Sequence, residues 1–144
     1  MIRKKLHNEA ETVDFAAKLS QSLEPGSVVA MHGDLGAGKS VFCRAVMRAL
    51  GVTDEAMPSP TFAIIQEYEG SGCKVAHMDW YRLHGADELE GIGIRDYMQP
   101  PWICLIEWPD RCPEMLDGHT IHVALSCTDN SPEERLVEID DSPL

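Results

Sequence analysis

Two stretches of the chain carry the apolar spacing of helices. In residues 8–23, apolar side chains recur every three or four positions after the capping sequence N-E-A-E, and Pro25 ends the pattern. In residues 39–50, polar side chains recur only every fourth position among apolar neighbours, and Gly51 follows. We therefore predict a first helix with one buried face and a second, mostly buried helix with a single polar stripe.

Short apolar runs between and after these helices indicate strands. Residues 27–32 and 102–106 are almost wholly apolar, which is typical of strands buried on both faces. A Gly-Ser-Gly turn joins two further runs into a predicted antiparallel hairpin. A short acidic helix is expected at 87–90. The other predicted strands are 62–68, 74–78, 120–125 and 136–139.

The length of 144 residues allows one domain. We take residues 1–144 as a single domain. Residues 129–144 hold six acidic side chains and one basic one, and we expect this acidic stretch, which includes the predicted strand 136–139, to end in a loose C-terminal tail.

The net charge of −12 argues against a broad nucleic-acid-binding surface, because binding to many phosphates needs clustered lysine and arginine. It does not exclude one small phosphate ligand, since residues 33–48 hold three basic side chains and one acidic one. No apolar run approaches the ~18 residues of a membrane span, and five scattered cysteines form no CxxC pair. We expect a cytoplasmic protein that binds neither membrane nor DNA.

The segment GDLGAGKS, residues 33–40, fits the pattern G-x-x-x-x-G-K-[ST] between a predicted strand and a predicted helix. This context is that of a P-loop, whose glycines let backbone N–H groups approach phosphate oxygens. Lys39 is then placed to reach the β- and γ-phosphates, and the Ser40 hydroxyl to bind Mg²⁺. The motif predicts a nucleotide as ligand.

A P-loop site needs an acid near the magnesium ion, and two strand ends offer one. Glu107 closes the apolar run 103–106 and is the best placed candidate, the alternative being an ordinary surface carboxylate. Asp79 follows a second run, and three roles stay open for it: holding the water shell of magnesium, orienting the attacking water, or a structural hydrogen bond.

Other candidates are less sharply defined. Thr61 lies in a loop where P-loop GTPases place a threonine that senses the γ-phosphate, although Ser-Pro-Thr is also a common turn. Arg82 and Arg95 could stabilise charge on a phosphoryl group, but pairing with neighbouring acids is the favoured interpretation. Neither an NKxD-like motif after the P-loop nor a DxxG before Glu107 is present, which disfavours a guanine-specific switch protein.

Five segments in this order resemble the bacterial TsaE family, formerly the YjeE family. They are GDLGAGKS at 33–40, SPTF at 59–62, HMDWYRL at 77–83, ELEGIGIRDY at 88–97 and ICLIEWP at 103–109. The resemblance covers about residues 8–109. It implies an α/β fold, a single-domain P-loop NTPase-like sandwich with a mixed central β-sheet flanked by helices.

The resemblance also implies a function. Members of this family bind ATP and Mg²⁺, hydrolyse ATP weakly alone, and are required for the threonylcarbamoyl group on adenosine 37 of tRNAs that read codons beginning with adenine. They act with the TsaD and TsaB proteins and do not catalyse the transfer; their ATPase is thought to reset that complex between turnovers. Contact with tRNA is thus expected only through the complex.

Position by position, the resemblance supplies roles for the site residues. Ser40 and Glu107 match the magnesium-binding hydroxyl and carboxylate, while two positions depart from the usual pattern: Ser40-Val41 replaces Thr-Thr, and Trp80 replaces leucine. The expected catalytic residues are Lys39, Thr61, Asp79, Glu107 and Trp108. The expected nucleotide-binding residues are Gly33, Leu35, Gly36, Ala37, Gly38, Lys39 and Ser40.

Two other function classes remain open from the residues alone. A small-molecule kinase would need an arginine-bearing lid, for which Arg111 and Arg135 are the only candidates after Glu107. A nucleotide-gated binding module would bind ATP and work without hydrolysis.

Overall fold

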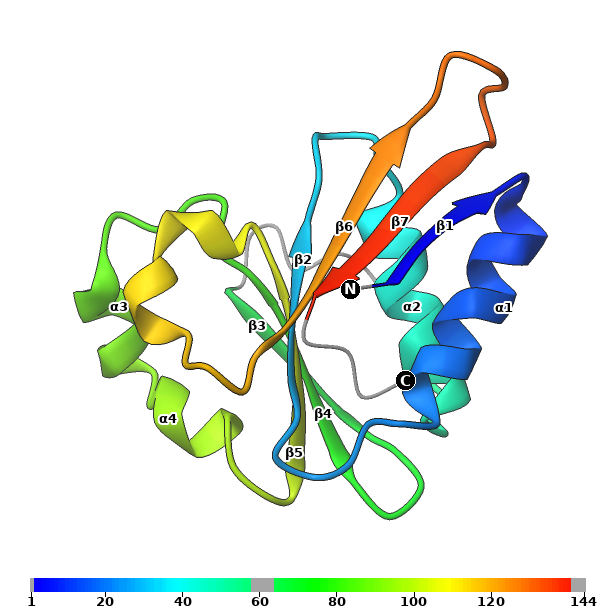
Figure 1. Cartoon of the computed structure of the whole chain (residues 1–144). Helices are drawn as coiled ribbons and strands as arrows, with labels where there is room; N and C mark the ends of the chain where they lie inside the picture. The colour runs from blue at the N-terminus through cyan, green and yellow to red at the C-terminus, as the bar shows by residue number, and fades with distance from the viewer. Residues whose placement is uncertain (1, 58–63, 141–144) are drawn as a thin grey trace.

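A computed structural model describes residues 2–57 and 64–140. One seven-stranded sheet forms the middle of the molecule, with helices on both faces (Figure 1). The strands are β1 (Ile2–Leu6), β2 (Val28–His32), β3 (Ile65–Glu69), β4 (Lys74–Asp79), β5 (Trp102–Glu107), β6 (Ile121–Cys127) and β7 (Arg135–Asp140). The helices are α1 (Glu9–Ser20), α2 (Lys39–Ala49), α3 (Ala86–Gly91), α4 (Ile94–Tyr97), and the short 3₁₀ turns η1 (Pro109–Arg111) and η2 (Pro113–Met115).

The strand order is β1-β7-β6-β2-β5-β4-β3. The four central strands β6, β2, β5 and β4 run parallel, while β1, β7 and β3 pair antiparallel with their neighbours. The expected mixed sheet in a single α/β domain is therefore confirmed. Parallel strands end at the same edge of a sheet, so the carboxyl ends of β2, β5 and β4 lie next to one another.

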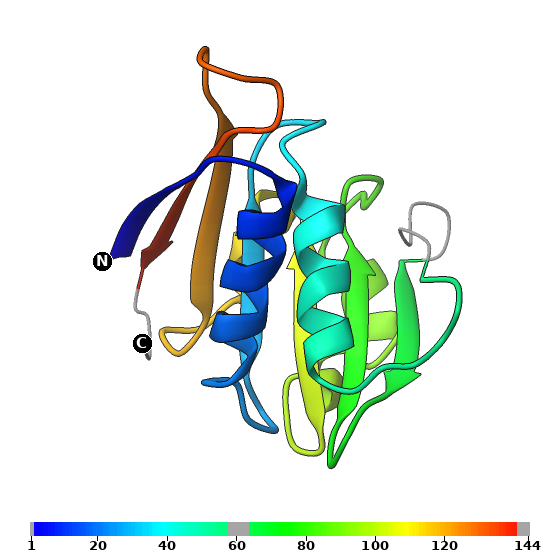
Figure 2. The ribbon, with the colours of Figure 1, turned by 90° about the vertical axis from the view of Figure 1, so that its right-hand side faces the viewer.

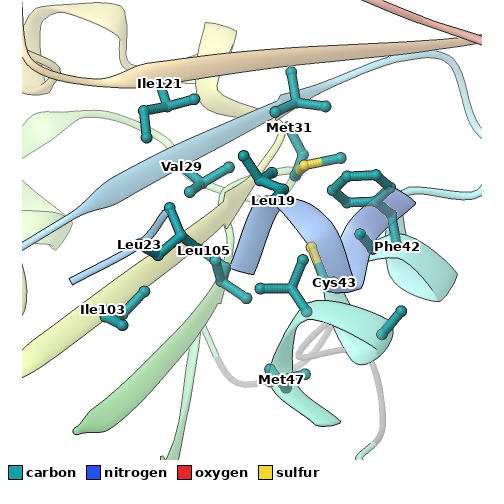
Figure 3. Packing of buried hydrophobic residues seen from close by; sticks show 14 of the residues in the cluster. Leu19, Leu23, Val29, Met31, Phe42, Cys43, Met47, Ile103, Leu105 and Ile121 are labelled. Atoms are coloured by element: carbon teal, nitrogen blue, oxygen red, sulfur yellow. The ribbon is translucent and has the colours of Figure 1, made fainter. Parts of the chain in front are cut away.

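Helices α1 and α2 lie side by side across one face of the sheet (Figure 2). Between them and the sheet lies the larger apolar core, in which Leu19, Val29, Phe42 and Leu105 are almost fully buried (Figure 3). Burying each such side chain contributes about 1.5–3 kcal/mol to folding. This packing fixes α2, and with it the loop that precedes α2, relative to the strand ends.

The other face of the sheet carries α3, α4 and the two 3₁₀ turns (Figure 1). Its core includes Met78, Ile94 and Ile106, which are fully buried. Trp80 is also fully buried in this second core, so it does not line the site around Asp79 and acts as core packing. Successive residues of an extended chain point to opposite faces of a sheet. Asp79 and Trp80 are adjacent and therefore have different surroundings.

Most predicted elements are confirmed. The N-cap of α1 forms as expected, with Asn8 Oδ1 accepting from the Glu11 backbone N–H at 2.9 Å. Glu11 Oε1, however, accepts from the backbone N–H of His7 at 3.1 Å, which differs from the reciprocal bond of a capping box. The predicted hairpin corresponds to β3 and β4, with residues 62 and 63 outside the described part.

Within the acidic stretch 129–144, the strand predicted at 136–139 is confirmed and covers residues 135–140. These residues form β7, which pairs with β6 on one side and with β1 on the other. Val137 and Ile139 are fully buried in the larger core, so Glu138 between them and Asp140 after them lie on the opposite face of the strand. Residues 141–144 lie outside the described part of the chain.

Candidate functional site

The loop of residues 33–38 runs from the end of β2 to the first turn of α2. Gly36 and Gly38 adopt φ of 84° and 97°, a backbone region that favours glycine. At Gly33, an added Cβ would lie 2.6 Å from the backbone oxygen of Leu125 in β6. The glycines of the motif thus let the loop turn sharply and approach the neighbouring strand closely.

Lys39 opens α2 and turns back across this loop. Its Nζ donates to the backbone oxygen of Gly33 and to that of Asp34, the latter at 3.3 Å, and lies 3.7 Å from the centre of the Trp108 ring. Burial lowers the pKa of Lys39, while the nearby Glu107 and Asp79 carboxylates oppose that shift. The ammonium group is therefore held at the loop, next to two acids and an aromatic face.

Glu107 closes β5 and is 3% exposed. Its two carboxylate oxygens lie 3.2 and 3.3 Å from the Ser40 hydroxyl, which donates to them. His77 Nε2 lies 2.7 Å from Oε2 of the same carboxylate. A carboxylate only accepts hydrogen bonds, so this nitrogen carries the proton and the histidine holds Glu107 toward Ser40.

Asp79 closes β4 directly opposite Glu107 in the parallel register. Its Oδ1 accepts from the backbone N–H of Tyr81 at 2.9 Å. Burial raises the pKa of the Asp79 carboxyl, and the Tyr81 N–H opposes that shift. This carboxylate has a structural hydrogen bond and still faces the open space beside the loop.

A cavity of about 440 Å³ lies between the loop and the two strand ends. It brings together most of the predicted site residues, with Arg135 from the far end of the chain and Arg82 and Tyr81 from the segment after β4. Its lining comprises Leu35, Gly36, Gly38, Lys39, Ser40, Val41, Asp79, Tyr81, Arg82, Glu107, Trp108 and Arg135.

The remaining predicted residues take varied places. Ala37 is buried in the loop and Gly33 forms its start, whereas the Leu35 side chain is 85% exposed at its tip. Thr61 lies outside the described residues. Arg95 bonds Glu90 at 3.0 Å on the surface, as the favoured interpretation of that residue predicted.

Trp108 follows Glu107 with φ of 58° and ψ of 49°, a left-handed conformation that is uncommon for a bulky side chain. The turn carries the indole across Lys39 on one side and against Tyr81 on the other, with ring centres 4.9 Å apart. Arg111 lies 5.0 Å from the Tyr81 ring. The two aromatic rings are thus stacked between two cations, and Lys39, Trp108 and Tyr81 of this stack line the cavity.

The sequence did not identify His77 as a site residue, and it offered Arg135 only as a candidate lid arginine of a kinase. His77 stands two positions before Asp79, and the period of a strand places both side chains on one face, which is a usable signal. Arg135 Nε donates to the backbone oxygen of Ala37 at 2.8 Å. No local pattern indicates this contact, because it joins β7 to a loop almost a hundred residues earlier.

The side-chain oxygens and backbone N–H groups of the site suit the two ligands that a P-loop motif implies, Mg²⁺ and phosphate. A hydroxyl and a carboxylate within 3.3 Å of one another supply the oxygen ligands that Mg²⁺ prefers. The glycine-rich loop at the start of α2 supplies backbone N–H groups for phosphate. Fold and site together define an α/β protein of the P-loop class.

The family model described as "Threonylcarbamoyl adenosine biosynthesis protein TsaE" matches residues 6–137. Relatives named tRNA threonylcarbamoyladenosine biosynthesis protein TsaE include those of Rickettsia conorii and Bacillus subtilis, each 36% identical, and of Haemophilus influenzae, 33% identical. The alignments cover 88%, 82% and 90% of this chain and 71%, 73% and 85% of those relatives. The chain belongs to the TsaE family.

A solved structure agrees with this assignment. The crystal structure of YdiB from Bacillus subtilis superposes with a TM-score of 0.73 and 31% sequence identity, covering 94% of this chain and 82% of YdiB. Within residues 2–57 and 64–140, no helix is both long and apolar enough to cross a membrane.

Proposed function

We propose that this chain is a Mg²⁺-dependent ATP-binding protein and ATPase that is required for the threonylcarbamoyl modification of adenosine 37 in tRNAs reading codons that begin with adenine. It would act in the cytoplasm with TsaD and TsaB, meet tRNA only through that complex, and leave the transfer step to its partners. The names of its relatives support the pathway, and the site supports the chemistry.

One observation carries the ATPase proposal. Lys39, Ser40, Asp79 and Glu107 come from α2, β4 and β5 and converge on one cavity at the carboxyl edge of the parallel strands. A glycine-rich loop forms the adjacent wall. Phosphoryl transfer depends chiefly on positioning and charge stabilisation, which this set provides.

Each residue then has a defined task. The loop N–H groups and Lys39 bind the phosphates, which requires the Lys39 ammonium to exchange its backbone oxygens for phosphate oxygens. Ser40 and Glu107 would hold Mg²⁺, which when bound neutralises charge on the phosphates. Asp79 is positioned by the Tyr81 N–H and orients water at the cavity wall. Trp108 covers Lys39 and excludes solvent from it.

ATP hydrolysis by the native chain and by Lys39→Ala, each with and without TsaD and TsaB, tests the proposal. We expect slow hydrolysis alone, faster hydrolysis with the partners, and loss of both in Lys39→Ala. Equal and negligible rates in all four samples would overturn the ATPase proposal.

Glu107→Ala and Asp79→Ala separate an ATPase from a nucleotide-gated binding module. We expect both variants to bind ATP, to lose hydrolysis and to fail in tRNA modification. Full modification without hydrolysis would instead support the binding module. A phosphorylated metabolite would support a kinase.

A further inference from the structure

Three side chains of different chemistry meet beneath the P-loop. Cys43 lies in the second turn of α2, His77 in β4 and Glu107 at the end of β5. One ligand atom from each lies within 4.8 Å of the others, and the residues are 1%, 0% and 3% exposed. Figure 3 shows Cys43 between α2 and the sheet.

The fold explains this meeting. Ser40 and Cys43 are three residues apart and share the face of α2 that packs on the sheet. His77 and Asp79 share a face of β4, and the register places Asp79 opposite Glu107. Glu107 is therefore reached from two directions, by the Ser40 hydroxyl and by the His77 imidazole.

We propose that Cys43, His77 and Glu107 form a binding site for Zn²⁺, and that its occupation withdraws Glu107 from Mg²⁺. Thiolate, imidazole and carboxylate are the three ligand types of protein zinc sites, and sites with three protein ligands to zinc are common. Mg²⁺ prefers an all-oxygen shell, so the thiol and imidazole select zinc over magnesium. The two sites share only the Glu107 carboxylate.

Proton and charge balance is simple. Zinc binding replaces the thiol S–H bond of Cys43 by a zinc–sulfur bond, and that proton leaves to solvent. The His77 proton moves from Nε2, which becomes a ligand, to Nδ1, which has no hydrogen-bond partner among the described residues. Thiolate and carboxylate together neutralise the dication, which favours its burial.

A second pair of donors provides an internal control. His32 Nε2 and His122 Nδ1 lie 2.9 Å apart with ring centres 5.1 Å apart. The two nitrogens therefore point at each other through a shared hydrogen, and not at a common metal position. Zinc bound by this pair would be lost in His122→Ala.

Titration of the full-length, nucleotide-free protein with Zn²⁺ against a chromophoric chelator tests the site. We expect one Zn²⁺ per chain, at least tenfold weaker binding in Cys43→Ala, and no change in Cys104→Ala or His122→Ala. Cys104 is a matched control, since it is fully buried on the opposite face of the sheet. Equal affinity in native protein and Cys43→Ala, or loss of binding in His122→Ala, would overturn the proposal.

Co²⁺ in place of Zn²⁺ gives a second readout that does not depend on activity. A thiolate-to-cobalt charge-transfer band is expected in native protein and Cys104→Ala. It should be absent in Cys43→Ser, which nearly preserves the side-chain volume and so guards against a folding defect. A band of native intensity in Cys43→Ser would contradict the site.

The inhibitory consequence rests on the proposed ATPase function, whereas the binding does not. We expect Zn²⁺ to inhibit hydrolysis in a manner that excess Mg²⁺ relieves, and Cys43→Ala to resist that inhibition. Inhibition of equal strength in Cys43→Ala would refute the consequence. Absence of hydrolysis without zinc would refute the ATPase function and leave the Zn²⁺ and Co²⁺ titrations as the measure of the site.

Discussion

At the scale of single residues, the buried Glu107 carboxylate depends on its two donors, Ser40 and His77. A buried charged acceptor that loses a hydrogen bond costs about 1–3 kcal/mol of stability. The His77 ring, being fully buried, also fixes where the carboxylate points. We therefore treat His77 as a positioning residue for Glu107.

Replacing His77 tests this role. We expect His77→Phe to lower Tm by several degrees and to weaken the Mg²⁺ dependence of hydrolysis, because Glu107 loses its shorter hydrogen bond. His77→Gln retains an N–H donor and should recover part of both effects. Thermal unfolding and Mg²⁺ titrations measure them. If Phe and Gln behave alike, the donor is not what matters.

Asp79 gives a prediction about pH. Its pKa is raised above 3.8 by burial, so the folded protein takes up this proton at higher pH than the unfolded chain does. The ionised carboxylate therefore lowers stability at neutral pH, and this loss disappears as pH falls through the raised pKa toward the unfolded value.

We therefore expect Asp79→Asn to unfold at pH 7 with a free energy equal to or above that of native protein, while hydrolysis is lost. The difference in stability should shrink as pH falls toward about 4. Denaturant titrations over this range measure it, with Asp87→Asn on the surface as control. A variant much less stable than native protein at pH 7 would contradict the account.

At the scale of elements, the P-loop is supported from two sides. Helix α2 fixes its end, and Arg135 at the start of β7 fixes its middle through Ala37. The Arg135 guanidinium also donates to the backbone oxygens of Pro132 and Glu134 at 2.7 and 2.9 Å. The hairpin of β6 and β7 is thereby joined to the P-loop.

Removing this connection should loosen the loop. We expect Arg135→Ala to weaken ATP binding about three- to tenfold, since one hydrogen bond contributes about 0.5–1.5 kcal/mol. Equilibrium binding of a fluorescent ATP analogue measures the change. Arg3→Ala, on the exposed side of β1, is the matched control and should bind as native protein does. Equal affinity in both variants would show that the contact does not shape the loop.

The elements also show what the sequence can and cannot predict. Helices α1 and α2 and strands β2 and β5 can be predicted from local apolar spacing, because the apolar side chains that form each pattern are the ones that become buried. Strand β1 has the sequence IRKKL with three exposed basic residues, and it forms through pairing with β7 at the other end of the chain. Such a strand has no local signal.

The site likewise has features that the sequence predicts and features that it does not. The P-loop, Glu107 and Asp79 are recognisable because strand ends and a glycine pattern mark them. Their meeting at one edge depends on the order β2-β5-β4, which is not the order along the chain. The contact from Arg135 and the burial of Trp80 in the second core depend on the folded arrangement alone.

At the scale of the whole molecule, the charge of −12 is unevenly placed. Lys39, Arg82 and Arg135 line the cavity together with Asp79 and Glu107. The overall acidic excess repels polyanions, while the three cations at the loop suit the one phosphate chain of the proposed ATP ligand. This distribution is consistent with the proposal that the chain serves tRNA modification through protein partners.

We expect the isolated chain to bind tRNA weakly, and its affinity for tRNA to depend little on salt concentration. A protein of similar charge that does not bind tRNA is the control. Filter binding or fluorescence anisotropy between 50 and about 200 mM salt measures this. A tight complex whose affinity falls steeply with salt would contradict an indirect role for tRNA.

The most direct test of the central claim is formation of threonylcarbamoyladenosine on tRNA over many turnovers, reconstituted with TsaD, TsaB and this chain. The account predicts sustained modification with native protein, and none beyond the level without the chain for Lys39→Ala or Glu107→Ala. Equal modification with the chain, with either variant or without it would contradict the claim.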